Sequence, residues 1–98
     1  MILQELQKKQ IEALKSRETF RLGVIRYLLS LIKNREIELR PQKMELTDEI
    51  VLKLLQKQVK KREELIEEYR KANRQDLVDK ESAELVIVKE LVEEFSRQ

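Results

Sequence analysis

The chain has 98 residues, 41% of them hydrophobic and 41% charged, with one glycine and no cysteine, histidine or tryptophan. This length suits a single domain over residues 1–98. Without cysteine or histidine there is no disulfide framework, thiol nucleophile, Ser-His-Asp triad or zinc cluster of the usual kind. A single glycine also excludes the glycine-rich loops that cradle phosphates. We therefore expect no catalytic, cofactor-binding or metal-binding residues, no cofactor, and no enzyme activity of the chain on its own.

The charge balance and the hydropathy pattern exclude further classes of protein. Lysine and arginine number 21 and aspartate and glutamate 19, and the formal net charge of +2 is too small to indicate nucleic-acid binding by bulk charge alone. No run approaches the ~18 apolar residues that span a bilayer. Residues 1–10 lack the basic start and apolar core of a signal peptide. The expectation is a cytoplasmic protein with no membrane contact.

Aliphatic, glutamate, lysine, arginine and glutamine residues dominate, which favours helix throughout and shows no strand-like alternation. The first of four predicted helices covers residues 2–15, with an apolar side formed by Leu3, Leu6, Ala13 and Leu14 and weakened by Gln10. Ser16 follows directly. We expect its hydroxyl to cap the next helix by accepting a hydrogen bond from an unpaired amide.

The second predicted helix, over residues 17–39, has the widest apolar arc in the chain. Two adjoining stripes form it, one of Leu22, Ile25, Leu29 and Ile32 and one of Phe20, Val24, Leu28 and Leu31. A helix that is apolar over so much of its circumference is usually central, with neighbours on more than one side. Gly23 costs a helix interior up to about 1 kcal/mol relative to alanine, so we expect it to permit a close helix crossing.

Local signals place the third helix. Pro41 disfavours helical geometry at Arg40, so the second helix should end near there. Thr47 is expected to cap a third helix that continues to about Ala72, with acidic residues in its first turn that complement the helix dipole. Asn73 is the expected stop, because asparagine tolerates the left-handed conformation that closes many helices.

The fourth predicted helix begins near Gln75 and continues through Phe95. Residues 85–88 are rich in β-branched side chains, but their flanks keep the helical period and no partner strand exists. The predicted fold class is therefore all-α, an antiparallel four-helix domain with the second helix central. Ile87 and Val92 are expected to stay uncovered in a single bundle, which predicts weak self-association or a groove for a missing domain.

A local run of basic residues is the clearest candidate site. Between Glu49 and Glu63 there is no acid, and the basic residues are Lys53, Lys57, Lys60, Lys61 and Arg62. The spacings of 4, 7 and 8 residues from Lys53 put the other three lysines along one side of a helix, as a ridge that could follow a phosphate backbone. The alternative is a solvated face that keeps a charged bundle soluble.

Other polar groupings carry weaker signals. A second acid-free stretch, between Glu18 and Glu36, contains Arg21, Arg26, Lys33 and Arg35. The acidic turn formed by Glu63, Glu64, Glu67 and Glu68 lacks the loop of a calcium site and the histidines of a di-iron site, so it is expected to be a solvated face, with Glu67 paired to Lys71. Tyr27 and Tyr69 could stack a base, but both lie in apolar arcs and are expected to be partly buried.

Six segments of the chain resemble, in the same order, the GatB/YqeY family. They are RLGVIR at 21–26, IKNREIE at 32–38, LTDEIV at 46–51, LQKQVKKR at 55–62, YRKANRQDL at 69–77 and KESAEL at 80–85. The resemblance covers roughly residues 5–92. The sequence differs from the family pattern at Asn73, where members typically carry glycine, and at Val92-Glu93, where they carry Leu-Pro.

The resemblance implies a helical domain similar to the carboxy-terminal part of the B subunit of the tRNA-dependent amidotransferase, a glutamine-dependent carbon-nitrogen ligase. Family members continue into a small second helical domain associated with tRNA, which this chain is expected to lack. The resulting hypothesis is a non-catalytic module that contacts tRNA phosphates through Lys53, Lys57, Lys60 and Lys61, with Arg62 and Arg74. The alternatives are a protein-interaction or oligomerisation domain of an amidotransferase-like assembly and, third, an enzyme in its own right.

Overall fold

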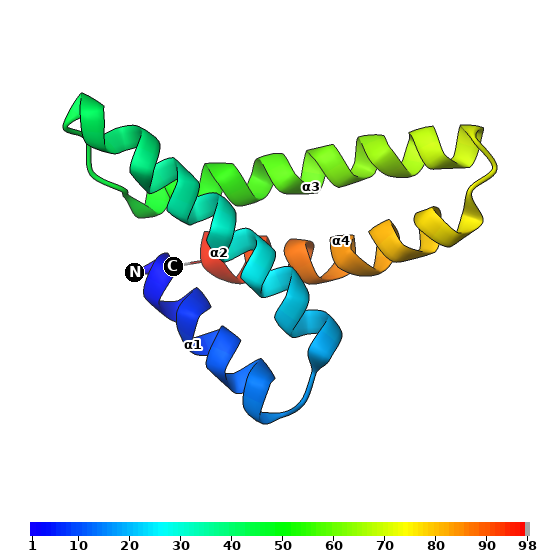
Figure 1. Ribbon diagram of the computed structural model, residues 1–98, viewed down its shortest axis with the longest axis horizontal. Coiled ribbons are helices and arrows are strands. Elements are labelled where there is room, and N and C mark those ends of the chain that lie inside the picture. Colours follow the sequence, from blue (N-terminus) through cyan, green and yellow to red (C-terminus); the bar gives the residue numbers. More distant parts are fainter. Residues whose placement is uncertain (98) are drawn as a thin grey trace. The chain divides into compact units, whose positions relative to one another are not determined.

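The computed structural model describes residues 1–97 and is helical, with no strand in that range. Its elements are α1 (Ile2–Lys15), α2 (Thr19–Leu39), the short 3-10 helix η1 (Arg40–Gln42), α3 (Asp48–Lys71) and α4 (Gln75–Ser96) (Figure 1). The all-α, four-helix prediction is confirmed, including helical structure over residues 85–88. The chain divides into two compact units, Met1–Leu54 and Leu55–Gln98. The organisation as a single domain stays a prediction.

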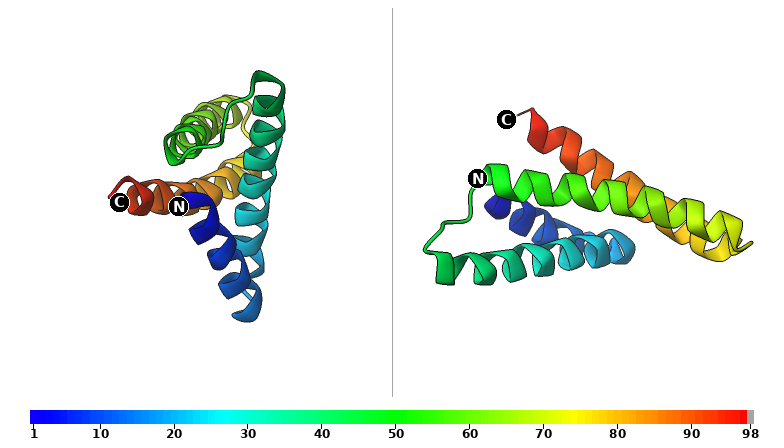
Figure 2. Two further views of the ribbon diagram at one scale, coloured as in Figure 1. Left: turned by 90° about the vertical axis from the view of Figure 1, so that its left-hand side faces the viewer. Right: turned by 90° about the horizontal axis from the view of Figure 1, so that it is seen from above.

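In the first unit, α1 and α2 run in opposite directions from a tight turn at residues 16–18 (Figures 1 and 2). The buried side chains of α1 recur at helical spacing and are Ile2, Leu6 and Ala13. Those of α2 are Leu22, Val24, Ile25, Leu28, Ile32 and Leu39. These buried side chains cover about half of the circumference of α2, in agreement with the wide apolar arc predicted for this helix.

The turn between α1 and α2 corrects the predicted start of the second helix. Ser16 does not cap α2: it closes α1, where its backbone N–H donates to the carbonyl of Glu12 (3.0 Å), and the residue before α2 is Glu18, with no side-chain cap hydrogen bond. Arg17 is left-handed (φ 58°), and the N–H of Glu18 donates to the carbonyl of Ala13 (3.0 Å), the pattern of a Schellman closure. Helix α2 therefore begins at Thr19, two residues later than expected.

Three residues on the outer side of α2 also differ from expectation. Gly23 is exposed, and a Cβ atom built on it would have no neighbour within 4 Å, so the expected close helix crossing is wrong. Phe20 and Tyr27 are exposed by 49% and 43%. Both lie at the edge of the apolar arc, where a large side chain can extend into solvent.

Several predicted boundaries are confirmed. Helix α2 ends at Leu39, two residues before Pro41, and the chain continues as the single 3-10 turn η1. The hydroxyl of Thr47 accepts a hydrogen bond from the backbone N–H of Ile50 (3.2 Å), which is the expected helix cap. One contact was not predicted: an oxygen of the Asp48 carboxylate accepts the backbone N–H of Ile2 (3.0 Å), which joins the start of α3 to the start of α1.

In the second unit, the rest of α3 and α4 form an antiparallel helical hairpin (Figures 1 and 2). Asn73 is left-handed (φ 55°), and the N–H of Arg74 donates to the carbonyl of Tyr69 (2.9 Å), so the predicted stop is confirmed. The buried apolar residues of this unit are Leu55, Ile66, Val78, Ile87, Val88, Leu91 and Phe95. The expectation that Ile87 stays uncovered is therefore wrong, whereas Val92 is half-buried.

Candidate nucleic-acid interface

Four lysines of α3 form what we call the lysine ridge: Lys53, Lys57, Lys60 and Lys61. All four side chains are exposed. Consecutive helical residues are turned by about 100°, so Lys57 and Lys60 lie within about 40° of the direction of Lys53, and Lys61 lies at the flank. The eight residues from Lys53 to Lys61 cover about 12 Å of the helix. A duplex presents several phosphates over such a length, since it carries one charge per about 1.7 Å of axis.

The ridge differs along its length in whether its charges are paired. The ammonium group of Lys53 lies 3.2 Å from a carboxylate oxygen of Glu49, one turn earlier, in a pair whose two side chains are both well exposed. For Lys57, Lys60 and Lys61, no acidic side chain of residues 1–97 lies within the 4.0 Å of an ion pair. Three adjacent cations therefore remain available to an external anion.

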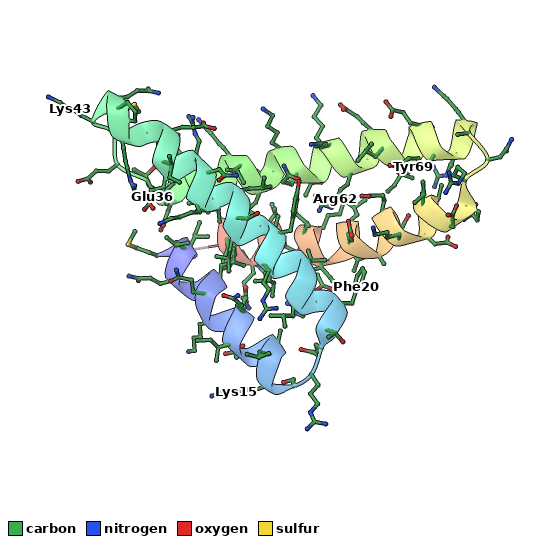
Figure 3. The ribbon with its side chains drawn as sticks, viewed as in Figure 1. Lys15, Phe20, Glu36, Lys43, Arg62 and Tyr69 are labelled. Carbon is green, nitrogen blue, oxygen red and sulfur yellow. The ribbon has the colours of Figure 1, made fainter. Side chains whose placement is uncertain are left out.

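Arg62, which the sequence groups with the ridge, lies elsewhere. It is nine residues from Lys53, about two and a half helical turns, which puts it on the opposite side of α3. The residue is only 7% exposed and lies between α3 and α4 (Figure 3). Its guanidinium donates a hydrogen bond to Gln58 (2.8 Å) and faces Glu84 (3.5 Å) and Glu81 (4.0 Å). The expectation that Arg62 contacts phosphate is corrected, because this side chain is buried inside the hairpin.

The cluster around Arg62 contains more acidic than basic side chains. Glu81 and Glu84 bring two carboxylates to one guanidinium, with side chains exposed by 16% and 18%. Burial raises the pKa of the Glu81 carboxyl, the nearby charge of Glu84 raises it further, and Arg62 opposes both effects. This cluster is an internal ion-pair network of the hairpin, and sequence spacing alone could not find it.

Arg74 is also removed from the ridge. It precedes α4 and binds Asp76 through two hydrogen bonds, of 3.2 Å from Nε and 3.0 Å from an Nη atom. This hydrogen bonding raises the pKa of Arg74 and lowers that of Asp76. The acidic residues Glu64, Glu67 and Glu68 lie on α3 between Lys61 and Arg74. The ridge therefore ends at Lys61.

The acidic half of α3 makes ordinary surface pairs. Glu67 pairs with Arg70 (3.0 Å) and not with Lys71 as predicted. Glu63 faces Lys89 of α4 (3.6 Å), and both side chains are half exposed. Within the described residues no group of three or more acidic side chains is arranged to hold a metal ion, and none of the helices is long and apolar enough to cross a membrane.

The structure also shows a groove in the first unit that sequence reasoning did not predict. It has a volume of about 460 Å³. Its lining residues come from α1, from α2 and from the segment before α3, and are Leu3, Gln7, Gln10, Arg26, Leu29, Ser30, Ile32, Lys33, Glu36 and Leu46. The only sequence signal was the acid-free stretch of α2, which contributes Arg26 and Lys33.

Comparison with known proteins identifies one family that matches nearly the whole chain. The family described as Yqey-like protein matches residues 3–96 of this chain. An uncharacterised protein of Schizosaccharomyces pombe is 34% identical over 91 residues, which cover 93% of this chain and 72% of that protein.

Two further relatives are named Altered inheritance of mitochondria protein 41, mitochondrial. The protein of Lachancea thermotolerans is 39% identical over 85 residues, covering 86% of this chain and 44% of the relative. That of Pyrenophora tritici-repentis is 35% identical over 88 residues, covering 90% of this chain and 47% of the relative. The chain thus spans less than half the length of these two mitochondrial relatives.

These names correct the location expected from the sequence. The cytoplasmic expectation rested on the composition of residues 1–10, whereas relatives that match most of the chain are named as mitochondrial proteins. The cytoplasmic expectation is therefore wrong. The composition of such a short segment does not determine the compartment in which the folded domain works.

Proposed function

This chain belongs to the YqeY-like protein family, and from that premise we propose that it is a non-catalytic helical module that contacts tRNA through the lysine ridge. The observation that supports the proposal is the exposure of Lys57, Lys60 and Lys61 on one side of α3 without an acidic partner in residues 1–97. Such lysines bind phosphates as point charges and transfer no proton. The role of the module is to hold RNA, not to change it.

The position of the ridge relative to the hairpin supports this role. Lys53, Lys57 and Lys60 lie on the side of α3 opposite Arg62, and Lys61 lies at the flank, so the cluster around Arg62 takes up no ridge charge. Exposed lysines contribute little to folding stability, and a ridge of them can therefore change without loss of the fold. An electrostatic contact of this kind reads the shape and charge of RNA but no sequence.

A titration of bulk tRNA at roughly 50 and 200 mM monovalent salt tests the proposal. Mitochondrial tRNA should be included, because relatives of the chain are named as mitochondrial proteins. The parent should bind at the lower salt concentration. The triple variant Lys57→Glu, Lys60→Glu, Lys61→Glu should lose detectable binding, whereas its thermal unfolding should stay nearly unchanged.

The matched control reverses three exposed lysines outside α3, in the variant Lys8→Glu, Lys15→Glu, Lys80→Glu. It has the same net charge as the ridge variant, so bulk charge cannot explain a difference between them. We expect the control to keep its tRNA affinity within about threefold. Equal loss in both variants, or no affinity of the parent at the lower salt concentration, would refute a local ridge contact.

A second candidate function, a protein-interaction or oligomerisation domain of an amidotransferase-like assembly, has one observation in its favour. Val59 and Val92 line an apolar groove of about 210 Å³ between α3 and α4, together with Gln56, Lys89 and Glu93. An uncovered apolar groove on a small hairpin is a typical contact surface. Sedimentation of the parent and of Val92→Ser tests it, because association through this groove gives a concentration-dependent mass only in the parent.

A further inference from the structure

The groove of the first unit is lined by apolar and polar side chains of α1 and α2 and by Leu46. Leu29 and Ile32 of α2 are among the apolar ones, and the groove holds about 460 Å³, within the range of about 300 to 1,000 Å³ typical of small-molecule sites. The ridge on α3 contributes none of its lining. The groove is thus a feature of the fold that the proposed function leaves unused.

The α2 side of the groove carries two cations. Arg26 and Lys33 are seven residues apart on α2, about two helical turns, so they share one side of the helix. Lys33 forms an exposed pair with Glu36 at 3.5 Å. No acidic side chain of the described chain pairs with Arg26, whose planar guanidinium can bind a phosphate through two parallel hydrogen bonds.

The α1 side of the groove carries amides. Gln7 and Gln10 are three residues apart on α1 and therefore lie side by side on the helix surface. Each amide offers a donor and an acceptor, the combination that pairs with the edge of a nucleobase. The apolar lining residues, which include Leu29 and Ile32, suit the flat face of a base.

We propose that this groove binds a nucleoside 5′-monophosphate, with the phosphate on Arg26 and Lys33 and the base against the amides and the apolar lining residues. The charged lining residues are Arg26, Lys33 and Glu36, one net positive charge, which matches a single phosphate group better than a triphosphate. The nucleotide is either free or the 5′-terminal nucleotide of an RNA strand. This site goes beyond the proposed function, because the ridge contacts phosphates whether or not the groove is filled.

An NMR titration of the intact chain tests the site with four probes: AMP, ribose 5-phosphate, inorganic phosphate and a short single-stranded RNA that carries a 5′-phosphorylated adenosine. AMP should shift the amide signals of groove residues such as Gln7 and Leu29, and leave those of residues 57–61 unchanged. AMP should bind about tenfold more tightly than ribose 5-phosphate, since the base makes contacts of its own. If the RNA binds as tightly as AMP, the ligand is the 5′-terminal nucleotide of an RNA strand. If AMP binds and the RNA does not, the ligand is the free nucleotide.

Three variants make the result specific. Arg26→Gln with Lys33→Gln should weaken AMP binding by about tenfold or more, because it removes the charge-assisted hydrogen bonds. Ser30→Trp, at an exposed position of the wall, should block the groove without changing its charge. Lys8→Gln with Lys15→Gln is the matched control and should bind AMP as the parent does.

The ridge variant separates this site from the proposed function. Reversal of Lys57, Lys60 and Lys61 should abolish tRNA binding and leave AMP binding unchanged. Absence of any shift with AMP at low millimolar concentration would overturn the site, as would equal AMP binding by the parent and by the Arg26→Gln, Lys33→Gln variant. Equal binding of AMP and inorganic phosphate would overturn it too, because the base would then make no contact.

Discussion

Arg62 of α3 and Glu84 of α4 form a largely buried ion pair, with 3.5 Å between Nε and a carboxylate oxygen and side chains exposed by 8% and 18%. Because Glu81 faces the same guanidinium, removal of Arg62 leaves two carboxylates without their cation. Arg62 therefore links the two helices of the hairpin, and its substitution should affect folding and not RNA binding.

We predict that Arg62→Met lowers the free energy of unfolding by about 2 to 4 kcal/mol, somewhat less than for a fully buried pair, since the carboxylates keep some contact with water. Lys89→Met is the control, because it breaks the exposed pair with Glu63 across the same hairpin and should cost less than about 1 kcal/mol. Urea unfolding measures both. Equal stability of the two variants would contradict a structural role for Arg62.

The raised pKa of Glu81 predicts the direction in which the stability of the fold changes with pH. Its pKa is raised in the folded chain, first by burial and then by Glu84, so the folded state holds the proton to a higher pH than the unfolded state. Its contribution to stability is full below the ordinary carboxyl pKa of about 4.3 and is lost as pH rises through the folded pKa. Glu81→Gln should flatten this fall, which urea unfolding measures at a series of pH values rising from the ordinary carboxyl pKa of about 4.3.

Asp76 provides a control, because its contribution to stability changes with pH in the opposite direction. The hydrogen bond from Arg74 lowers its pKa, so its contribution is present above the ordinary carboxyl pKa and is lost as pH falls through the folded pKa. Asp76→Asn should therefore remove part of the acid-induced loss of stability and leave the fall caused by Glu81 unchanged. A fall that persists in Glu81→Gln would show that another group causes it.

Gly23→Ala should stabilise the chain by up to about 1 kcal/mol. Gly23 is an exposed residue inside α2, a new Cβ would meet no atom within 4 Å, and alanine is the better helix former. Thermal unfolding of the variant measures the gain. A loss of stability would show that a neighbour approaches this glycine closely, as the sequence led us to expect.

Asp48→Ala should destabilise the first unit by about 1 to 2 kcal/mol, because the backbone N–H of Ile2 loses its acceptor. Glu49→Ala is the control, since Glu49 lies in the same first turn of α3 and pairs only with exposed Lys53. Hydrogen exchange at the start of α1 should increase in Asp48→Ala alone. Equal exchange in the two variants would assign the effect to the helix dipole instead.

Local signals in the sequence were sufficient for most helix boundaries. Thr47, Asn73 and Pro41 act on backbone groups within a few residues of themselves, and the boundaries that they predicted agree with the structure. The turn at Arg17 was missed, because a left-handed arginine is uncommon and no glycine marks it. Arg62 was expected at the surface, because arginine is mostly exposed in folded proteins. The burial of Arg62 depends on acids about twenty positions away, which no local pattern reveals.

The salt dependence of RNA binding tests the central claim most directly. The slope of log K against log salt counts the phosphates contacted, at about 0.9 per contact on a duplex, so three free ridge lysines predict a slope near −3 for the parent. Each of Lys57→Ala, Lys60→Ala and Lys61→Ala should reduce the steepness by about one, equally for different RNAs, whereas Lys8→Ala should not change it. Slopes that are the same in all four variants and the parent would contradict the account.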